Sequence, residues 1–391
     1  MANIILTVGG LWGKIISWFG SFIPSFGLTI IVFTIALKLI LSPLEVYQKI
    51  TTKKNTEIQA KLQPKLAKLQ KQYANNREML NQKQMELYKK ENYNMVGSCL
   101  GVFINLAVTL AVFITLFSSL NQISQYNIKT EYETLSKTYE ETFVLTAKDN
   151  SYSIVLETNE NGEITETVES LMQKINSQIS NEEDRNAFIQ NLKVDAKTAT
   201  VEKYKEIKEG FLWIKNIYRP DTYATVFPNA KDYMNISNTN FKKVSAENPY
   251  KDIYGNIATT EETAIANFTN VFNDVTGDIN KTYKGWNGYL ILVILSAVIT
   301  VLSQILTSKT TKPTPQYDKN GEEIKMPNPN GKLMMILLPA LMIIFTLQYS
   351  AAFALYIVIN SLMSVIISFV TSLVMNSVEK RKLEKNNSKE V

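Results

Sequence analysis

One lysine inside an apolar run is the residue of this chain with the clearest chemical meaning. Lys38 lies in Gly27–Leu44, a stretch long enough to approach the span of a bilayer, and it is the only charged residue within any long apolar run of the chain. A cation at such depth costs about 2.5–3.5 kcal/mol on insertion scales. We therefore expect Lys38 to face protein or water. The alternative is a lysine that snorkels to the membrane interface, two helical turns away.

Polar residues follow Lys38 at helical spacing. Thr34 and Ser42 lie four residues to either side of it and so share its helix face. Other apolar runs carry comparable stripes: Ser98, Asn105 and Thr109; Ser296, Thr300, Ser303, Gln304 and Thr307; and Tyr356, Asn360, Ser364, Ser368 and Thr371. Only the run 333–347 is almost purely apolar. The pattern predicts that four helices surround a polar groove and that the helix formed by residues 333–347 faces lipid.

Two interpretations of these stripes remain open. Ser and Thr commonly form hydrogen bonds between packed membrane helices, at about 0.6 kcal/mol each. The groove interpretation gains weight from Lys38, because no acidic residue lies within any apolar run to neutralise it. An unpaired ammonium needs water or loses its proton, so we expect the groove to be hydrated. The candidate groove residues are Lys38, Thr34, Ser42, Asn105, Thr109, Ser303, Gln304, Tyr356 and Asn360.

The apolar runs themselves predict an all-α membrane protein with five spans. The expected spans are residues 27–44, 95–120, 287–308, 333–349 and 350–376. The last two meet at Gln348-Tyr349-Ser350, which we interpret as a tight turn. A single buried helix would instead run unbroken through this segment and contain Pro339.

Charge predicts the orientation of the spans. Residues 45–94 carry 11 Lys and Arg against 5 Asp and Glu, whereas 121–286 carry 18 against 25. The loop 309–332 and the tail 377–391 each carry 5 basic against 3 acidic residues. The positive-inside rule then places 45–94, 309–332 and the basic tail in the cytoplasm. The N-terminus and the acidic segment are expected outside.

The connecting segments have their own patterns. Residues 1–26 are expected to form an external interfacial helix or arm, with two tryptophans suited to headgroup level. Residues 45–94 are expected to form a basic cytoplasmic helical hairpin that turns at Asn75-Asn76. Its candidate contact residues are Lys53, Lys54, Lys61, Lys65 and Lys68. Such a hairpin suits lipid headgroups, ribosomal RNA or another protein, or is simply a solvated face.

Residues 121–286 are too long for a loop and predict a small extracytoplasmic α+β insert. Phe143–Ala147 and Ser151–Leu156 have the residue pattern of strands, Asn161-Gly162 that of a turn, and helical patterns cover about 165–215.

Missing residue types exclude several functions. The chain has no histidine, which excludes Ser-His proteolysis, an HExxH zinc site and histidine proton relays. No apolar run contains an Asp for intramembrane proteolysis, and no GxxxxGK[ST] phosphate loop occurs. We therefore expect neither an enzyme nor a bound cofactor or metal.

The order of these motifs resembles the YidC/Oxa/Alb family of membrane-protein insertases. The resemblance rests on Gly27–Thr34 followed by Lys38 and Leu41–Leu44, the helix around Leu62-Gln63-Pro64, and the entry Gly97–Leu100. It continues through Phe211–Ile214 with Pro220-Asp221, Lys332–Pro339 and Leu355–Asn360, and covers about half of the chain. The family usually has arginine where Lys38 stands. Lysine keeps the charge but lacks the planar donor fork.

The resemblance implies a bacterial cell-membrane insertase and chaperone. Its core would be five helices around a groove open to cytoplasm and lipid, and it would use no cofactor. Nascent membrane proteins and membrane lipids would be its partners, with the ribosome and the Sec translocon as further candidates and DNA excluded. Two other functions stay open: a channel or transporter, and a membrane-anchored protein that binds ligands through its external insert.

Overall fold

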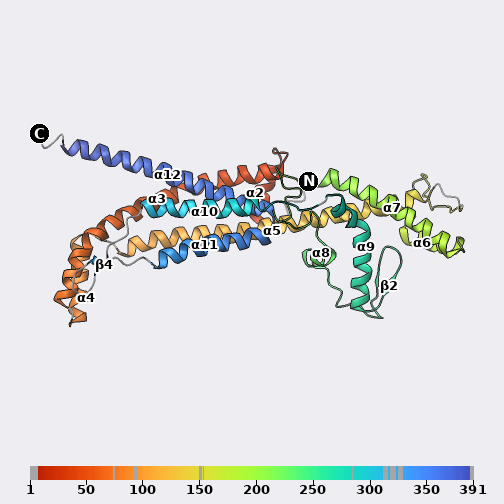
Figure 1. Ribbon diagram of the computed structural model, residues 1–391, viewed down its shortest axis with the longest axis horizontal. Helices are drawn as coiled ribbons and strands as arrows, with labels where there is room; N and C mark the ends of the chain where they lie inside the picture. Colours follow the sequence, from red (N-terminus) through yellow and green to blue (C-terminus); the bar gives the residue numbers. More distant parts are fainter. Residues whose placement is uncertain are drawn as a thin grey trace.

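The computed structural model describes residues 8–73, 75–91, 93, 95–148, 152, 154–283, 285–310, 316–317, 323–324 and 329–387. Its helices are α2 (Gly10–Gly20), α3 (Phe26–Gln72), α4 (Arg77–Lys90), α5 (Met95–Thr146), α6 (Val168–Gln178), α7 (Glu182–Ile207), α8 (Ala230–Ser237), α9 (Glu261–Thr282), α10 (Ile291–Thr310), α11 (Pro329–Gln348) and α12 (Ala351–Asn387). Figure 1 shows an elongated molecule in which α3, α5, α10, α11 and α12 run alongside one another, with α4 at one end and α6 to α9 at the other.

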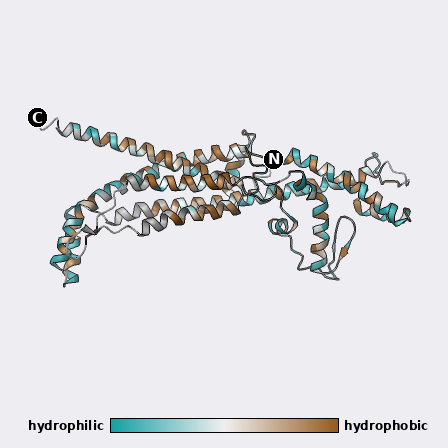
Figure 2. Ribbon diagram, viewed as in Figure 1, coloured by the Kyte–Doolittle hydropathy of each residue, from teal (hydrophilic) through white to brown (hydrophobic). Residues whose placement is uncertain are grey.

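Three stretches of the described helices are long and apolar enough to cross a membrane. They are Phe26–Asn55, Leu106–Thr146 and Ala351–Val378. Two shorter apolar stretches, Ile291–Leu306 and Pro339–Gln348, belong to α10 and α11. Figure 2 shows the hydrophobic residues concentrated on this helical bundle. The chain is therefore a multi-pass membrane protein, and the full count of five spans stays a prediction.

Helix α3 joins the first predicted span to the first predicted hairpin helix without a break. It contains two prolines, Pro43 and Pro64. A proline inside a helix has no N–H to donate to the carbonyl four residues earlier. At Pro43 the orphaned carbonyl is that of Leu39, and the Ser42 hydroxyl donates to it over 2.8 Å. This local substitute keeps the chain helical past the end of the apolar run.

Helix α5 likewise continues far beyond the predicted second span. The expected strand Phe143–Ala147 is wrong, because Phe143 to Thr146 form the last turn of this helix. Leu135, Tyr139 and Phe143 are spaced by four and are fully buried, so one helix face enters the core throughout. This long-range packing outweighs the strand preference of the local sequence.

The insert is mainly helical, so the predicted α+β class is not confirmed. Its described strands are β1 (Tyr250–Lys251) and β2 (Ile257–Ala258), a two-residue antiparallel ladder with Tyr250 opposite Ala258. The expected strand Ser151–Leu156 lies partly outside the described residues, and its described part 154–156 is not a strand. A second such ladder, β3 (Gln316–Tyr317) with β4 (Glu323–Ile324), lies in the loop between α10 and α11.

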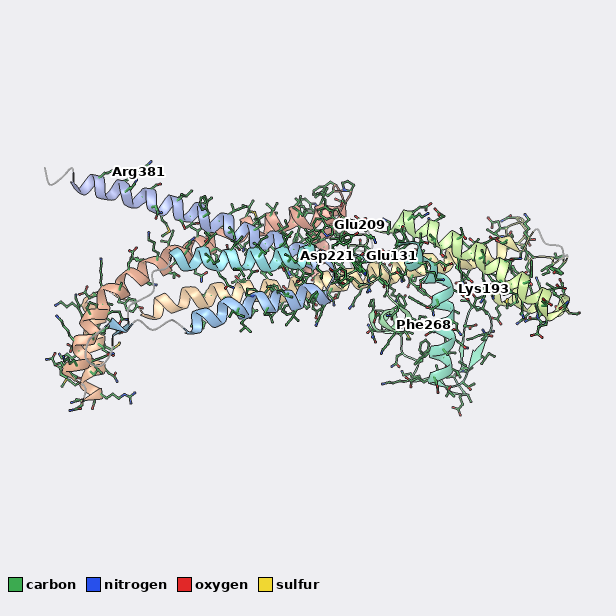
Figure 3. The ribbon with its side chains drawn as sticks, in the orientation of Figure 1. Glu131, Lys193, Glu209, Asp221, Phe268 and Arg381 are labelled. Atoms are coloured by element: carbon green, nitrogen blue, oxygen red, sulfur yellow. The ribbon has the colours of Figure 1, made fainter. Side chains whose placement is uncertain are left out.

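One segment of the insert provides hydrogen-bond acceptors for the N-terminal ends of α3 and α10. A Glu209 carboxylate oxygen accepts a hydrogen bond from the Phe26 N–H at the start of α3, 2.8 Å away. Asp221 accepts from the Tyr289 N–H at 2.9 Å and from the Leu292 N–H in the first turn of α10 at 2.7 Å. The N–H groups of Phe26 and Leu292 lie in the first turns of their helices and have no partner there, and the helix dipole also stabilises a carboxylate at this end. Figure 3 shows Glu209, Asp221 and Glu131 together at this junction.

The same segment, residues 209–221, also caps α12 through its backbone. The Arg219 carbonyl accepts from the Ala351 N–H at 2.8 Å, and the Ile217 carbonyl accepts from the Ala352 N–H at 3.0 Å. Helix α5 joins this junction through Glu131, whose buried carboxylate accepts from the Asn216 amide at 3.0 Å. Four helices of the bundle, α3, α5, α10 and α12, are thus bound to one segment of the insert.

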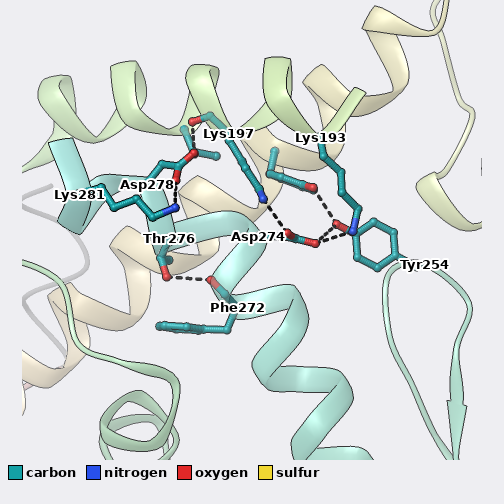
Figure 4. Close-up of polar contacts among 10 residues, drawn as sticks. Lys193, Lys197, Tyr254, Phe272, Asp274, Thr276, Asp278 and Lys281 are labelled. Atoms are coloured by element: carbon teal, nitrogen blue, oxygen red, sulfur yellow. Dashed lines mark hydrogen bonds and ion pairs between the residues drawn. The ribbon is translucent and has the colours of Figure 1, made fainter. Parts of the chain in front are cut away.

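The insert carries a cluster of charges around Asp274 of α9. Lys193 and Lys197 of α7 each place an amine nitrogen 2.8 Å from its carboxylate, and the Tyr254 hydroxyl donates to it over 2.9 Å. Figure 4 shows both lysines converging on this carboxylate. Burial opposes ionisation of Asp274, but the hydrogen bonds from Lys193 and Lys197 outweigh it and lower its pKa below 3.8.

Gly288 provides a direct test of the junction. A Cβ atom there would lie 1.8 Å from an Asp221 carboxylate oxygen and 2.9 Å from the Asp221 backbone. Gly288→Ala should therefore destabilise the protein by about 1–3 kcal/mol, as overpacking does. The matched control is Gly277→Ala within α9, where no atom lies within 4 Å of the added Cβ. Thermal unfolding in detergent, followed by circular dichroism, should lower the midpoint only for Gly288→Ala. Equal midpoints would contradict the proposed packing.

Acid titration tests the Asp274 cluster. Because the pKa of Asp274 is lowered in the folded state, its ionised form stabilises the fold above the ordinary value of 3.8, and this stability is lost as pH falls through the folded pKa. Asp274→Asn should be less stable than wild type at neutral pH and should lose less stability on acidification below about pH 4. Denaturant titrations at several pH values measure both quantities. Parallel acid-induced losses in the two proteins would contradict the assignment.

Candidate functional site

A polar cavity of about 600 Å³ lies among four helices of the bundle. Helix α5 contributes Thr109 to its wall, and α10 contributes Ser303. Helix α3 contributes Lys38, Glu45, Gln48, Lys49, Thr52 and Lys53. Helix α12 contributes Asn360, Ser364, Ile367, Ser368, Thr371, Ser372, Met375 and Asn376. None of the described lining residues comes from α11, and its orientation towards lipid stays a prediction.

Helical periodicity explains how α12 forms one wall of the cavity. On α12, Asn360, Ser364 and Ser368 are one turn apart, and the stripe continues to Asn376. On the opposite side of this helix, large apolar residues such as Leu362, Ile366 and Phe369 are exposed. The helix is therefore polar towards the cavity and apolar towards its surroundings.

Lys38 lies deep in the cavity and forms an ion pair with Glu45. Its side chain is only 7 % exposed, against 24 % for that of Glu45. The expectation that no acidic residue neutralises Lys38 is wrong. Glu45 follows the apolar run Gly27–Leu44 directly, and two helical turns place it on the same face as Lys38. Glu45 lies outside the apolar run, but its spacing of seven residues from Lys38 along a continuous helix predicts the contact.

A second lysine connects the two main walls. The Lys49 amine donates to the backbone carbonyl and to the hydroxyl of Ser368 on α12. Gln48, Lys49 and Thr52 were not among the predicted groove residues, because they follow the apolar run. Their signal is the same helical period, continued past Pro43.

The other predicted groove residues differ in position. Thr109, Ser303 and Asn360 line the cavity with Lys38, but Thr34 and Ser42 do not. The hydroxyl of Thr34 donates to the Ile30 carbonyl of its own helix over 2.6 Å, which satisfies it without a groove.

Two further predicted groove residues, Tyr356 and Gln304, do not line the cavity, and a third lies outside the described side chains. Tyr356 is buried against Phe353, at a ring distance of 6.2 Å. The amide nitrogen of Gln304 is buried without a hydrogen-bond partner among the described residues. The side chain of Asn105 lies outside the part of the chain that the structure describes.

The predicted hairpin lysines also separate into groups. Lys53 lines the cavity, whereas Lys54 and Lys61 are exposed on α3. Lys65 pairs with Glu91, and together with Lys68 it borders a shallow hollow between α3 and α4. The turn between these helices lies where expected, and the Asn76 side chain caps α4 by accepting from the Met79 N–H at 3.0 Å. Within the described residues no group of three or more His, Cys, Asp or Glu could hold a metal ion.

Cysteine labelling tests whether water enters the cavity. After replacement of the single native cysteine, Cys99, by serine, Ser364→Cys should react several-fold faster with a water-soluble maleimide in native membranes than Ile366→Cys. The thiolate reacts, and it forms only where water reaches the sulfur. Ile366 belongs to the same helix but is exposed on its apolar side. Equal rates at the two positions would contradict a hydrated cavity.

Comparison with known proteins identifies the family. The family model described as 60Kd inner membrane protein matches residues 18–379. Three similar proteins, each named membrane protein insertase YidC, come from Fusobacterium nucleatum (40% identical over 92 residues, 24% of this chain and 43% of that protein), Shewanella pealeana (32% over 123, 30% and 22%) and Leptospira interrogans (42% over 96, 25% and 14%).

The aligned regions cover less than half the length of each of these relatives. No solved structure matches the chain. The match over residues 18–379 confirms the resemblance to the YidC/Oxa/Alb insertases. The chain belongs to the 60Kd inner membrane protein family.

Proposed function

We propose that this protein is a membrane-protein insertase, which helps transmembrane segments enter and fold in the lipid bilayer without enzymatic chemistry. The observation that carries the proposal is the cavity around Lys38, which is polar inside and surrounded by apolar helix faces. The insertase name of the three relatives supports this function over a channel, a transporter or an anchored binding protein.

The physical argument concerns the cost of moving a polar tail across the bilayer. A short tail of the substrate must lose its water, and each unpaired polar group costs several kcal/mol in hydrocarbon. Thr109, Ser303, Asn360 and Ser364 offer hydrogen-bonding partners partway across, and Lys38 attracts acidic residues in the tail. Transfer of the substrate's apolar segment into lipid supplies the driving force, so no nucleotide is needed.

The cavity is proposed to open towards the cytoplasm and to be closed outside. Residues 351–358 at the start of α12 are all buried, and segment 209–221 lies against the N-terminal ends of α3, α10 and α12. The cavity begins two residues later, at Asn360, and extends towards Asn376 and Lys53. The positive-inside rule places that wide end, with the basic hairpin, in the cytoplasm and the N-terminus outside.

In this topology the chain would cross the membrane five times, and its cytoplasmic segments would bind the partners of the insertase. Helices α10 and α11 have 20 residues each, which is about 30 Å of helix and enough to cross a hydrocarbon core. Nascent membrane proteins would enter from the basic hairpin, where Lys54 and Lys61 are exposed to lipid headgroups or ribosomal RNA. The basic tail, which includes Arg381, extends from the same end of the bundle and would also contact ribosomes (Figure 3). The Sec translocon is a further proposed partner.

Reconstitution tests the function and the role of Lys38 together. The purified protein in liposomes should insert a single-span substrate with a short acidic tail. Lys38→Ala should lower the yield by up to about fivefold, the equivalent of an ion pair worth about 1 kcal/mol, and Lys38→Arg should retain most of it. Protease protection of the translocated tail measures the yield.

A matched control uses Lys14, an exposed lysine of α2 away from the cavity. Lys14→Ala removes the same charge and should insert the substrate like wild type. An absence of insertion by wild type, in liposomes where another member of the family succeeds, would reject the insertase function. Full activity of Lys38→Ala on acidic tails would reject the role of the cation.

A further inference from the structure

The ion pair between Lys38 and Glu45 has a feature that the proposed function does not require. Both residues line the cavity, and they occupy the same face of one helix, seven residues apart. Neutralising the charge of Lys38 would not require a partner seven residues away, because an acidic residue one helical turn away would pair with it more directly. Glu45 instead reaches back two turns from the more exposed part of the cavity to the deeper lysine.

Glu45 presents to Lys38 the same chemical group, a carboxylate, that a substrate would present. A carboxylate on Lys38 is the group that an acidic residue of a substrate tail would also present. While Glu45 is in place, Lys38 is only 7 % exposed, so an incoming carboxylate must displace it to reach the amine. The exchange keeps one carboxylate on Lys38 and therefore leaves no buried cation unpaired.

When a substrate carboxylate displaces Glu45 from Lys38, the Glu45 carboxylate can pair with Lys49 instead. Lys49 lies one turn further along α3 and lines the same cavity. A glutamate followed by a lysine four residues later is the favourable orientation for an ion pair on a helix. Lys49 donates to Ser368 and, among the described residues, forms no ion pair with a carboxylate. Glu45 can thus move between two lysines of one helix face.

We propose that Glu45 sets the selectivity of the cavity by acting as an internal competitor, which occupies Lys38 in place of a substrate carboxylate until an acidic tail displaces it. The inference rests on the proposed insertase function and adds a specificity-determining residue to it. Its consequence is that acidic tails bind weakly enough to leave, because each must compete with a tethered carboxylate at high effective concentration.

Peptide binding to the detergent-solubilised full chain measures this competition. The probe is a short fluorescent tail peptide that contains several Asp residues, beside a counterpart with Asn in their place. Glu45→Gln should bind the Asp peptide about fivefold more tightly than wild type, which corresponds to about 1 kcal/mol, and should leave the affinity for the Asn peptide unchanged. Glu57→Gln, an exposed position on the same helix outside the cavity, is the matched control and should bind like wild type.

Two further variants separate competition from a general change of charge in the cavity. Glu45→Asp keeps the charge but has a shorter side chain that reaches Lys38 less well. If Glu45 competes for Lys38, this variant should bind the Asp peptide more tightly than wild type. If only the negative charge in the cavity matters, its affinity should not change. This variant also carries the test if Glu45→Gln does not fold. In a Lys38→Gln background, the effect of Glu45→Gln should disappear.

Unchanged affinity in both Glu45 variants, or an effect that persists without Lys38, would overturn the proposal. Equal gains for the Asp and Asn peptides would overturn it as well. The binding assay also separates this inference from the proposed function. If Glu45→Gln shows the expected selectivity but the wild-type protein inserts no substrate into liposomes, the insertase function fails and the competitor role of Glu45 stands.

Discussion

Hydrogen bonding at the N-terminal ends of three helices of the bundle is the constraint on which the rest of this structure depends. Backbone N–H groups in the first turn of a helix have no partner within that helix, and burying them unpaired would cost about 1–3 kcal/mol each. Glu209, Asp221 and the carbonyls of Ile217 and Arg219 provide partners for α3, α10 and α12 at one place. The three helices therefore share a fixed origin, and their relative positions follow from it.

The cavity is a consequence of that arrangement. Near the junction, the first two turns of α12 are buried and apolar, so the helices pack closely and exclude water. Further along, Asn360, Ser364 and Ser368 replace the apolar residues on the inner face, and Lys38 and Glu45 lie opposite on α3. There Lys38 pairs with Glu45, and the Ser368 hydroxyl accepts a hydrogen bond from Lys49. The same helices are thus closed at one end and polar at the other.

Local sequence patterns predicted that Asn360, Ser364 and Ser368 share one face of α12 and that Lys38 is enclosed among polar residues, because both depend on helical period and on charge in an apolar run. They did not predict Glu45, which lies one residue beyond that run and reaches Lys38 only because α3 continues through Pro43. Nor could they predict the junction, where Glu209 and Phe26 are 183 residues apart. Contacts of that kind depend on tertiary structure, and no periodicity within a segment encodes them.

Site-specific photo-crosslinking during insertion tests the central claim, that the substrate's polar tail lies in this cavity. A photoreactive amino acid at Asn360 and, separately, at Leu362 compares two faces of the same helix, the first in the cavity and the second 42 % exposed on the apolar side. With a translation-arrested acidic-tailed substrate, the account predicts crosslinks from Asn360 to the tail and from Leu362 to lipid or the apolar segment. Crosslinks of the tail to Leu362 and none to Asn360 would contradict it.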